Sequence, residues 1–482
     1  MASRPKQRDL TQGAIGRTLL MFALPTLASS ILQSLNGSIN SVWIGRFLGE
    51  KALASTFNAN MVMFLLMAFV FGFGMAATVM VGQSWGRGDV DGARRVMGTA
   101  IGGFLPVAIG IGVVGWVAAP ALLRLLAMPP EALPLALAYL RVIFVAMPAI
   151  LLLVLMMMTL RGSGDAVTPL WFMMLAVFLD AGLNPVFILG LGPAPQLGIA
   201  GSALATVIAN YVALFALIVY IYARDLPLRL KGAELRYLIP ERALLGTILR
   251  KGLPMGLQMI VISSSALATI GLVNREGVET TAAFGVAMQL WTYLQMPAMA
   301  LGAAVSAMAA QNIGAGKWDR VSSITRSGIN YNLLITGALV VLLAFADRPA
   351  LALFLGSDSP ALPIARHIQL LATWSFLLFG VTMILFGTVR ANGAVLGPLI
   401  ILAIGLYPFR LGFALIAYRW LGADALWLSF PVSSLANMVM AIAFYRHGGW
   451  RKARLMAPIT SDQAIEDAEG LTEPGGRINP AG

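Results

Sequence analysis

The sequence FLDAGLNP, residues 178–185, sets one carboxylate in the middle of an apolar run that extends from about residue 167 to residue 189. A run of this length and composition predicts a helix that crosses a membrane. An ionised carboxylate at the centre of such a helix costs roughly 2.5–3.5 kcal/mol to insert, and residues of this kind usually face an internal cavity and have a function there. Asp180 is the only Asp or Glu in the interior of any apolar run of membrane length. Asn184 follows four residues later and therefore lies on the same face of the helix.

The composition of the whole chain predicts the same environment. Of its 482 residues, 59% are hydrophobic and only 11% are charged, whereas soluble globular proteins average about 25% charged residues. Apolar runs long enough to cross a bilayer recur along the chain, which is the pattern of a polytopic helical membrane protein. The sequence has no cysteine, and this excludes disulfides, a thiol nucleophile and a cysteine-ligated metal centre.

Twelve of these apolar runs are separated by short polar segments. Their ranges are about 18–44, 54–82, 95–120, 133–159, 166–190, 197–222, 252–273, 282–310, 325–346, 365–388, 395–418 and 424–445. We therefore expect an all-α integral membrane protein with twelve transmembrane helices.

The net charge of +12 comes from Lys and Arg residues that concentrate on one side of the predicted spans. With the N-terminus placed inside, 24 of the 33 fall in inner segments and 7 in outer segments, while Arg141 and Arg410 lie within spans. This asymmetry follows the positive-inside rule, so we expect both termini in the cytoplasm and the protein in the plasma membrane, which is the inner membrane of a Gram-negative bacterium. The placement argues against a nucleic-acid partner. The expected partners are the lipid bilayer and a small molecule, and we expect a monomer.

The two halves of the chain share polar and proline positions at a nearly constant offset of 228 or 229 residues. The matched anchors are Pro25 with Pro254, Asn60 with Gln289, QSWG at 83–86 with QNIG at 311–314, and TLRGSG at 159–164 with TVRANG at 388–393. Such spacing predicts two homologous six-helix lobes. Since six is even, both lobes insert with the same topology, which makes a parallel repeat of the kind found in secondary transporters.

This repeat divides the chain into five predicted parts. They are a cytoplasmic tail at 1–17, an N-terminal lobe at 18–223, a cytoplasmic linker at 224–251, a C-terminal lobe at 252–446, and a cytoplasmic, disordered tail at 447–482. Pro25 and Pro254 interrupt the first helix of each lobe, and we predict that both act as hinges.

The sequence carries no residue set for hydrolysis or metal chemistry. It has no Walker-type P-loop, no HExxH and no GxSxG motif. An intramembrane aspartyl protease needs two carboxylates, and Asp180 stands alone. His367 and His447 have no metal-ligating partner at helical spacing. We therefore expect neither an enzyme nor a protein with a resident metal or cofactor.

Several polar residues are predicted to lie at the depth of Asp180, slightly outside the midplane. Asn40 of the first span and Thr206 of the sixth are expected there together with Asn184. The wider set of candidates for binding the coupling ion or the substrate adds Gln33, Asn36, Asn60, Asn210 and Gln289. Two plainer interpretations stay open: the amides of the first span hold helices together, or Asp180 is a buried acid satisfied by neighbouring amides. Arg410, near the repeat equivalent of Asp180, either offsets its charge or extends toward the membrane surface.

Five motifs give the chain a resemblance to a known family. They are IGRFLGEKALA at 44–54, QSWG at 83–86, RGSGD at 161–165, NPVFI at 184–188 and LGIAGSALAT at 197–206, with counterparts in the second half. Over roughly residues 15–455 the sequence resembles the multidrug and toxic compound extrusion (MATE) family, and within it the DNA-damage-inducible subgroup.

This resemblance implies a transporter that exports amphipathic, often cationic compounds in exchange for protons or sodium ions. In similar proteins an acid in span one and an Asn-x-x-x-Asp pair in span five form a cation site in the N-terminal lobe. Here Asn40 stands at the position of the span-one acid, and the span-five pair reads Asp180-x-x-x-Asn184. Another branch carries an acid in span seven, where this chain has Ile262 and Ser263. A single carboxylate favours proton coupling over sodium coupling.

Three other functions remain as alternatives. A lipid-linked oligosaccharide flippase of the same superfamily is expected to have a cationic central cavity, for which only Arg141 and Arg410 are candidates. A non-transporting receptor has no need of duplicated lobes. A membrane enzyme needs a second catalytic group, which the spans do not supply.

Overall fold

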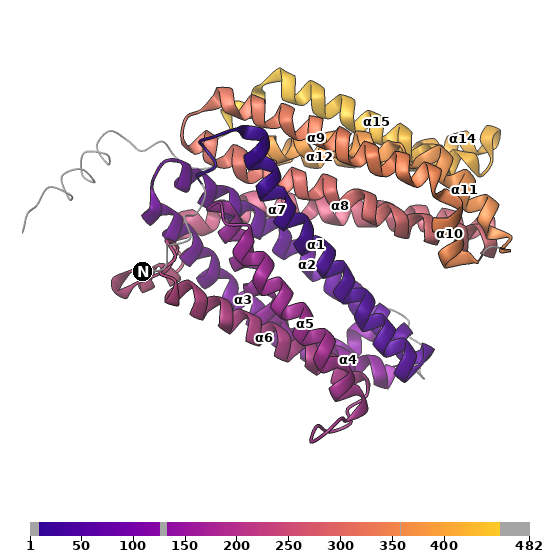
Figure 1. The fold of residues 1–482 in the computed structure, drawn as a ribbon, viewed down its shortest axis with the longest axis horizontal. Coiled ribbons are helices and arrows are strands. Elements are labelled where there is room, and N and C mark those ends of the chain that lie inside the picture. Colours follow the sequence, from indigo (N-terminus) through magenta and orange to yellow (C-terminus); the bar gives the residue numbers. More distant parts are fainter. Residues whose placement is uncertain (1–8, 126–132, 357, 454–482) are drawn as a thin grey trace, which may run out of the picture.

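A computed structural model describes residues 9–125, 133–356 and 358–453, and every regular element in these ranges is helical (Figure 1). The N-terminal half contains α1 (Ile15–Leu48), α2 (Glu50–Gly86), α3 (Val90–Leu125), α4 (Leu133–Gly162), α5 (Val167–Leu189) and α6 (Ile199–Ala223). The connection between the halves contains η1 (Gly232–Leu238). The C-terminal half contains α7 (Arg242–Val273), η2 (Asn274–Glu276), α8 (Val278–Gly314), α9 (Trp318–Phe345), α10 (Asp347–Leu355), α11 (Ala361–Ala372), α12 (Ser375–Ala391), α13 (Leu396–Ile404), η3 (Gly405–Gly412), α14 (Phe413–Leu421), α15 (Asp424–His447) and η4 (Gly449–Lys452). The predicted all-α fold is confirmed.

Eleven of the described helical segments are long and apolar enough to cross a membrane. The number reaches twelve when α11 and α12, which meet at a bend of 46°, are taken as one broken span. The twelve predicted spans are therefore confirmed. Several helices extend further than hydropathy alone predicted, because polar residues continue them beyond the apolar runs; α8, for example, reaches Gly314.

Two spans of the C-terminal half are not regular α-helices. The tenth is broken between α11 and α12, and the eleventh contains the π-helical segment η3 between α13 and α14. Pro408 lies inside η3. Because proline has no backbone N–H and its ring crowds the preceding turn, it disfavours the regular α-helical hydrogen-bond ladder. A π-helical segment inside a helix is rare and is frequently found at functional sites.

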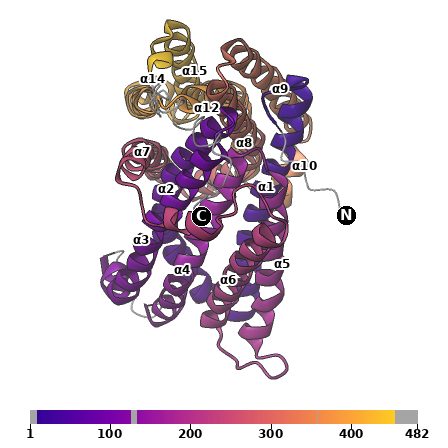
Figure 2. The same cartoon turned by 90° about the vertical axis from the view of Figure 1, so that its left-hand side faces the viewer.

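The two halves form two sets of helices that converge at one end of the molecule and diverge toward the other (Figure 1). At their junction α2 packs against α7 and α8, and α1 packs against α8 (Figure 2). Two glutamines from the repeated QxxG motif close the convergent end by reciprocal hydrogen bonds. Gln83 Nε2 donates to the carbonyl oxygen of Ala391 at 2.7 Å, and Gln311 Nε2 donates to that of Gly162 at 2.9 Å.

The glycines of the same motif let the backbones of the halves approach each other closely. A Cβ atom at Gly86 would lie 1.9 Å from the carbonyl oxygen of Gln311, and one at Gly314 would lie 2.1 Å from that of Gln83. Only glycine fits at these contacts. We call Gln83, Gly86, Gln311 and Gly314 together the interlobe seal.

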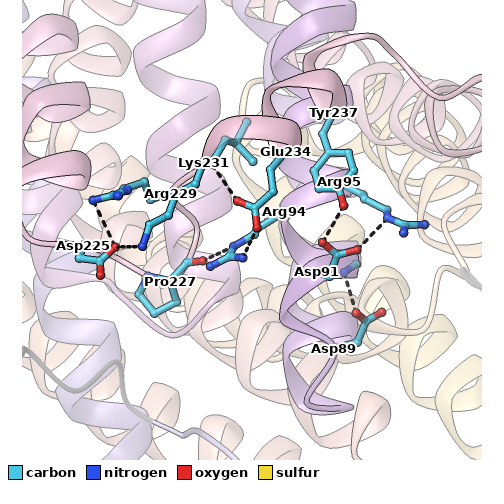
Figure 3. Close-up of polar contacts among 12 residues, drawn as sticks. Asp89, Asp91, Arg94, Arg95, Asp225, Pro227, Arg229, Lys231, Glu234 and Tyr237 are labelled. Atoms are coloured by element: carbon cyan, nitrogen blue, oxygen red, sulfur yellow. Dashed lines mark hydrogen bonds and ion pairs between the residues drawn. The ribbon is translucent and has the colours of Figure 1, made fainter. Parts of the chain in front are cut away.

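The connection between the halves is shorter than the predicted linker 224–251, because α7 already begins at Arg242. It is fastened to α3 by polar contacts (Figure 3). Arg94 donates to Glu234 Oε1 at 2.6 Å and to the carbonyl oxygen of Pro227 at 2.7 Å, and the Tyr237 hydroxyl donates to Asp91 at 2.8 Å. These contacts bind the linker to the N-terminal half.

Candidate functional site

Asp180 lies near the middle of α5, and its side chain is only 2% exposed. Both carboxylate oxygens accept hydrogen bonds from neutral side chains of three helices. Asn36 and Asn40 of α1 each donate to Oδ2 at 2.9 Å. Asn184 donates to Oδ1 at 3.1 Å, and the hydroxyl of Thr206 on α6 donates to Oδ1 at 3.0 Å. We call these five residues the Asp180 cluster.

Helical spacing and helix packing explain how the cluster forms. Asn36 and Asn40 are four residues apart on α1, and so are Asp180 and Asn184 on α5, so that each pair shares one helix face. Because α5 packs against both α1 and α6, these faces meet. Asn184 also donates to Asn40 Oδ1 at 3.0 Å, which ties the two pairs together.

Pro25 precedes this part of α1 by about three turns, and α1 remains one continuous helix around it. The hydroxyl of Thr26 donates to the carbonyl oxygen of Phe22 at 3.1 Å, and that of Ser29 donates to the carbonyl oxygen of Pro25 at 2.9 Å. Both are hydrogen bonds from a side-chain hydroxyl to the carbonyl four residues earlier, a pattern that is often associated with helix bending. The hinge role of Pro25 and of Pro254, which lies inside α7, stays a prediction.

No basic side chain among the described residues compensates the carboxylate of the Asp180 cluster. Within the described ranges no Lys, Arg or His forms an ion pair with Asp180. Two acceptors of the cluster, Asn36 Oδ1 and Asn184 Oδ1, are buried and have no hydrogen-bond partner among the described residues. A lone carboxylate surrounded by neutral donors, next to vacant acceptors, is chemically suited to take up a proton and rearrange its hydrogen bonds.

The remaining predicted residues lie outside these direct contacts. Asn210 donates to the carbonyl oxygen of Thr206 at 2.8 Å and so lies behind the cluster. Gln33 on α1 and Asn60 on α2 are exposed. Gln289 on α8 is exposed as well and donates to the Tyr293 hydroxyl at 3.4 Å. The structure therefore brings Asn36, Asn40, Asn184 and Thr206 onto Asp180 but leaves these four residues apart from it.

Sequence reasoning missed Ser202, whose buried hydroxyl has no hydrogen-bond partner among the described residues. Its carbonyl oxygen accepts from the Thr206 hydroxyl at 3.4 Å. The signal was available, because Ser202 precedes Thr206 by four residues on α6 and shares its helix face.

Arg410 does not contact Asp180. It lies on η3 in the C-terminal half, where its guanidinium stacks over the ring of Phe430 at 4.3 Å and its Nε donates to the Ser433 hydroxyl at 3.2 Å. Arg410 therefore does not offset the charge of Asp180 by direct contact, which was one of the two roles left open for it. Its side chain is half-buried inside the C-terminal lobe.

Comparison with known proteins places the chain in a family. The MatE family model matches residues 25–186 and again residues 254–416, so that each half carries one copy. The chain belongs to the MatE family. It is 34% identical to the probable multidrug resistance protein YoeA of Bacillus subtilis, over 92% of this chain and 96% of YoeA. It is 30% identical to the probable multidrug resistance protein YpnP of the same organism, over 93% of this chain and 99% of YpnP.

Solved structures support the same fold for this MatE protein. A crystal structure described as MATE in complex with MaL6 superposes with a TM-score of 0.84 at 23% identity, covering 92% of this chain and 98% of that one. The double match to the family model also supports the predicted two-lobe repeat, since the second copy begins 229 residues after the first.

Proposed function

We propose that this MatE protein exports small amphipathic or cationic molecules in exchange for a cation, and that the coupling site is the Asp180 cluster. Two relatives that align over nearly their full length, YoeA and YpnP, are named probable multidrug resistance proteins. The twelve spans in two repeated halves suit a transporter that alternates access to a site between its lobes. We assign it to the plasma membrane as a monomer, and to the DNA-damage-inducible subgroup.

The observation that carries the proposal is the isolation of Asp180 among four neutral donors. A sodium ion needs several oxygen ligands, whereas both oxygens of this single carboxylate already accept two hydrogen bonds each. A proton needs only one oxygen. We therefore favour proton coupling over sodium coupling. A neutral Asp180 would accept hydrogen bonds from Asn36 and Asn40 less strongly, because hydrogen bonds to charged groups are the stronger ones.

This weakening offers a way to couple protonation to movement. Asn36 and Asn40 join α1 to α5, so protonation of Asp180 loosens the contact between these helices, and α1 is free to bend at Pro25. One pH unit supplies about 1.4 kcal/mol, and the membrane potential supplies about 2.3 kcal/mol per charge per 100 mV. Together they are large enough to change the relative populations of two conformations.

The interlobe seal defines which end of the transporter is closed in this structure. If both termini are cytoplasmic, the seal lies on the cytoplasmic side, since it joins the inner ends of α2 and α8. The described conformation is then closed inside, which is the state in which Asp180 takes up an external proton and substrate is released. Breaking the seal opens the inward-facing state.

Flux measurements in proteoliposomes test the proposal when the proton and sodium gradients are imposed separately. We expect substrate flux with a pH gradient and little with a sodium gradient. Asp180→Asn is expected to reduce proton-driven flux to the protein-free background. Asp319→Asn, the same chemical change at an exposed acid of α9, is expected to leave it intact. Flux through Asp180→Asn at the wild-type rate would refute coupling at this residue, and ligand binding without any flux would favour a receptor.

A further inference from the structure

A second polar feature of the membrane region lies in the C-terminal half, where the proposed coupling does not use it. A cavity of about 200 Å³ lies there between α7, α8, α12, η3 and α15. Its walls are largely aromatic: Trp291 packs against Phe430 at 4.9 Å, Phe376 at 5.5 Å and Phe284 at 5.9 Å between ring centroids. Arg410 lines the same cavity, and we call this space the Arg410 cavity.

Arg410 is held in a fixed orientation and is not neutralised. Its Nε donates to the Ser433 hydroxyl, which in turn donates to the carbonyl oxygen of Phe430 at 2.9 Å, and Phe430 lies under the guanidinium plane. Among the residues that line the cavity none carries a carboxylate, and within the described chain no acid pairs with Arg410. Four of its five N–H groups are therefore left without a protein acceptor in the described structure.

Asn437 is a second polar residue of the cavity with a hydrogen-bonding group that the described residues do not satisfy. Its side chain is 7% exposed and lines the Arg410 cavity. Its Oδ1 has no hydrogen-bond partner among the described residues. Buried polar side chains are normally hydrogen-bonded, so this unpaired amide oxygen needs a hydrogen-bond donor, such as a water molecule or a hydroxyl or N–H group of a ligand. Arg410 is the group of this cavity that selects for an anion.

Both irregular spans frame this cavity. Arg410 belongs to the π-helical segment η3, and Phe376 follows directly after the bend between α11 and α12. At that bend the indole N–H of Trp291 contacts Gln369 Oε1 and the Thr373 hydroxyl, each at 3.0 Å, which fixes the ring that forms one wall. Interrupted helices often form binding sites in transporters. In this protein the two interrupted spans place the guanidinium of Arg410 beside a cavity with aromatic walls.

We propose that the Arg410 cavity binds an aromatic organic anion, with a carboxylate or phosphate group on Arg410 and the ring against Trp291 and its aromatic neighbours. A planar guanidinium pairs with such groups through two parallel hydrogen bonds. The pairing also removes an uncompensated charge from the membrane region, where such charges are costly. The claim that this ligand is transported rests on the proposed export function, and it extends the class of substrates from cations to anions. Binding itself is independent of transport.

Competition binding with ligands that differ only in charge tests this assignment. The protein is purified in the neutral detergent dodecyl maltoside, and binding of tritiated 2-naphthoate is displaced by unlabelled 2-naphthoate, by 2-naphthamide or by 2-naphthylmethylammonium. We expect 2-naphthoate to displace at least about tenfold more effectively than the other two, since only the carboxylate makes charge-assisted hydrogen bonds. Glycerol phosphate, an anion without a ring, represents a lipid headgroup and is expected to displace weakly.

Substitutions then locate the site. Arg410→Gln is expected to weaken 2-naphthoate binding at least about tenfold, and Arg410→Lys, which keeps the charge but loses the planar fork, is expected to weaken it less. The matched control is Arg141→Gln, since Arg141 also lies in a membrane helix and stacks over an aromatic ring, Trp116 at 4.7 Å, but in the other half. It is expected to bind as wild type does.

Three results would overturn the proposal. The first is equal displacement by naphthoate and naphthamide in the wild-type protein, which needs no variant to fold. The second is displacement by glycerol phosphate as effective as that by naphthoate, which would assign the site to an anionic headgroup. The third is undiminished binding in a folded Arg410→Gln protein. Because no gradient is present, none of them depends on whether Asp180 couples transport to protons.

Discussion

At the scale of single residues, Asn40 joins α1 to two members of the Asp180 cluster on α5. It donates to Asp180 Oδ2 and accepts from Asn184 Nδ2. Asn40→Ala removes both hydrogen bonds and leaves part of a buried carboxylate unsatisfied. We expect it to destabilise the folded protein by roughly 1–3 kcal/mol and to lower proton-driven flux several-fold. Thermal unfolding in detergent and proteoliposome flux measure the two effects.

Gln33→Ala is the matched control, because Gln33 lies two turns earlier on the same helix and is exposed. It is expected to leave both the unfolding temperature and the flux unchanged. If Asn40→Ala behaved like Gln33→Ala, the hydrogen bonds of Asn40 would have no part in stability or coupling.

At the scale of helices, the interlobe seal depends on a glycine at the end of α8. Gly314→Ala places a methyl group 2.1 Å from the carbonyl oxygen of Gln83, which is far too close, so we expect the seal to open. Ala310, which is fully buried near the seal, reports on opening when it is replaced by cysteine in this cysteine-free chain. The rate of Ala310→Cys labelling by a maleimide is expected to rise at least about tenfold in the Gly314→Ala background.

Gly285→Ala on the same helix has open space around its new methyl group and is expected to leave the labelling rate unchanged. Equal labelling rates in the two backgrounds would mean that the seal tolerates the extra atom and that close glycine contact is not what holds it shut.

At the scale of the whole molecule, the charge asymmetry predicts which loops face the cytoplasm. Pro193 lies in the exposed loop between α5 and α6, and Ala233 lies in the exposed linker before α7. We expect a membrane-impermeant maleimide to label Pro193→Cys in intact cells, and to label Ala233→Cys only after permeabilisation. The opposite labelling pattern would mean that the predicted topology is inverted and that the interlobe seal lies on the external side.

The sequence predicted the helical spans and the repeat because both leave local or periodic signals. Asn40, Asp180, Asn184 and Thr206 do lie together, and their common depth could be counted along each span. The bend between α11 and α12 could not be predicted, because the apolar run continues across it. The offset between the repeats places Arg410 near the position equivalent to Asp180. The offset does not say which side chains of other spans contact Arg410. Those contacts join residues that are far apart in the sequence.

The attachment of the linker to α3 also determines where the two halves can move relative to each other. Arg94, Glu234 and Tyr237 make the linker part of the N-terminal body (Figure 3). A Cβ atom at Gly102 would lie 1.7 Å from the carbonyl oxygen of Leu238, so this contact extends to the end of η1. The attachment continues to the start of α7, since the backbone N–H of Glu241 donates to the Thr99 hydroxyl of α3 at 3.4 Å. Because α7 itself packs along α2, the linker and the first turns of α7 are held together against the N-terminal half. A movement of the C-terminal half relative to the N-terminal half must therefore be taken up between α7 and the helices that follow it, and not within the linker.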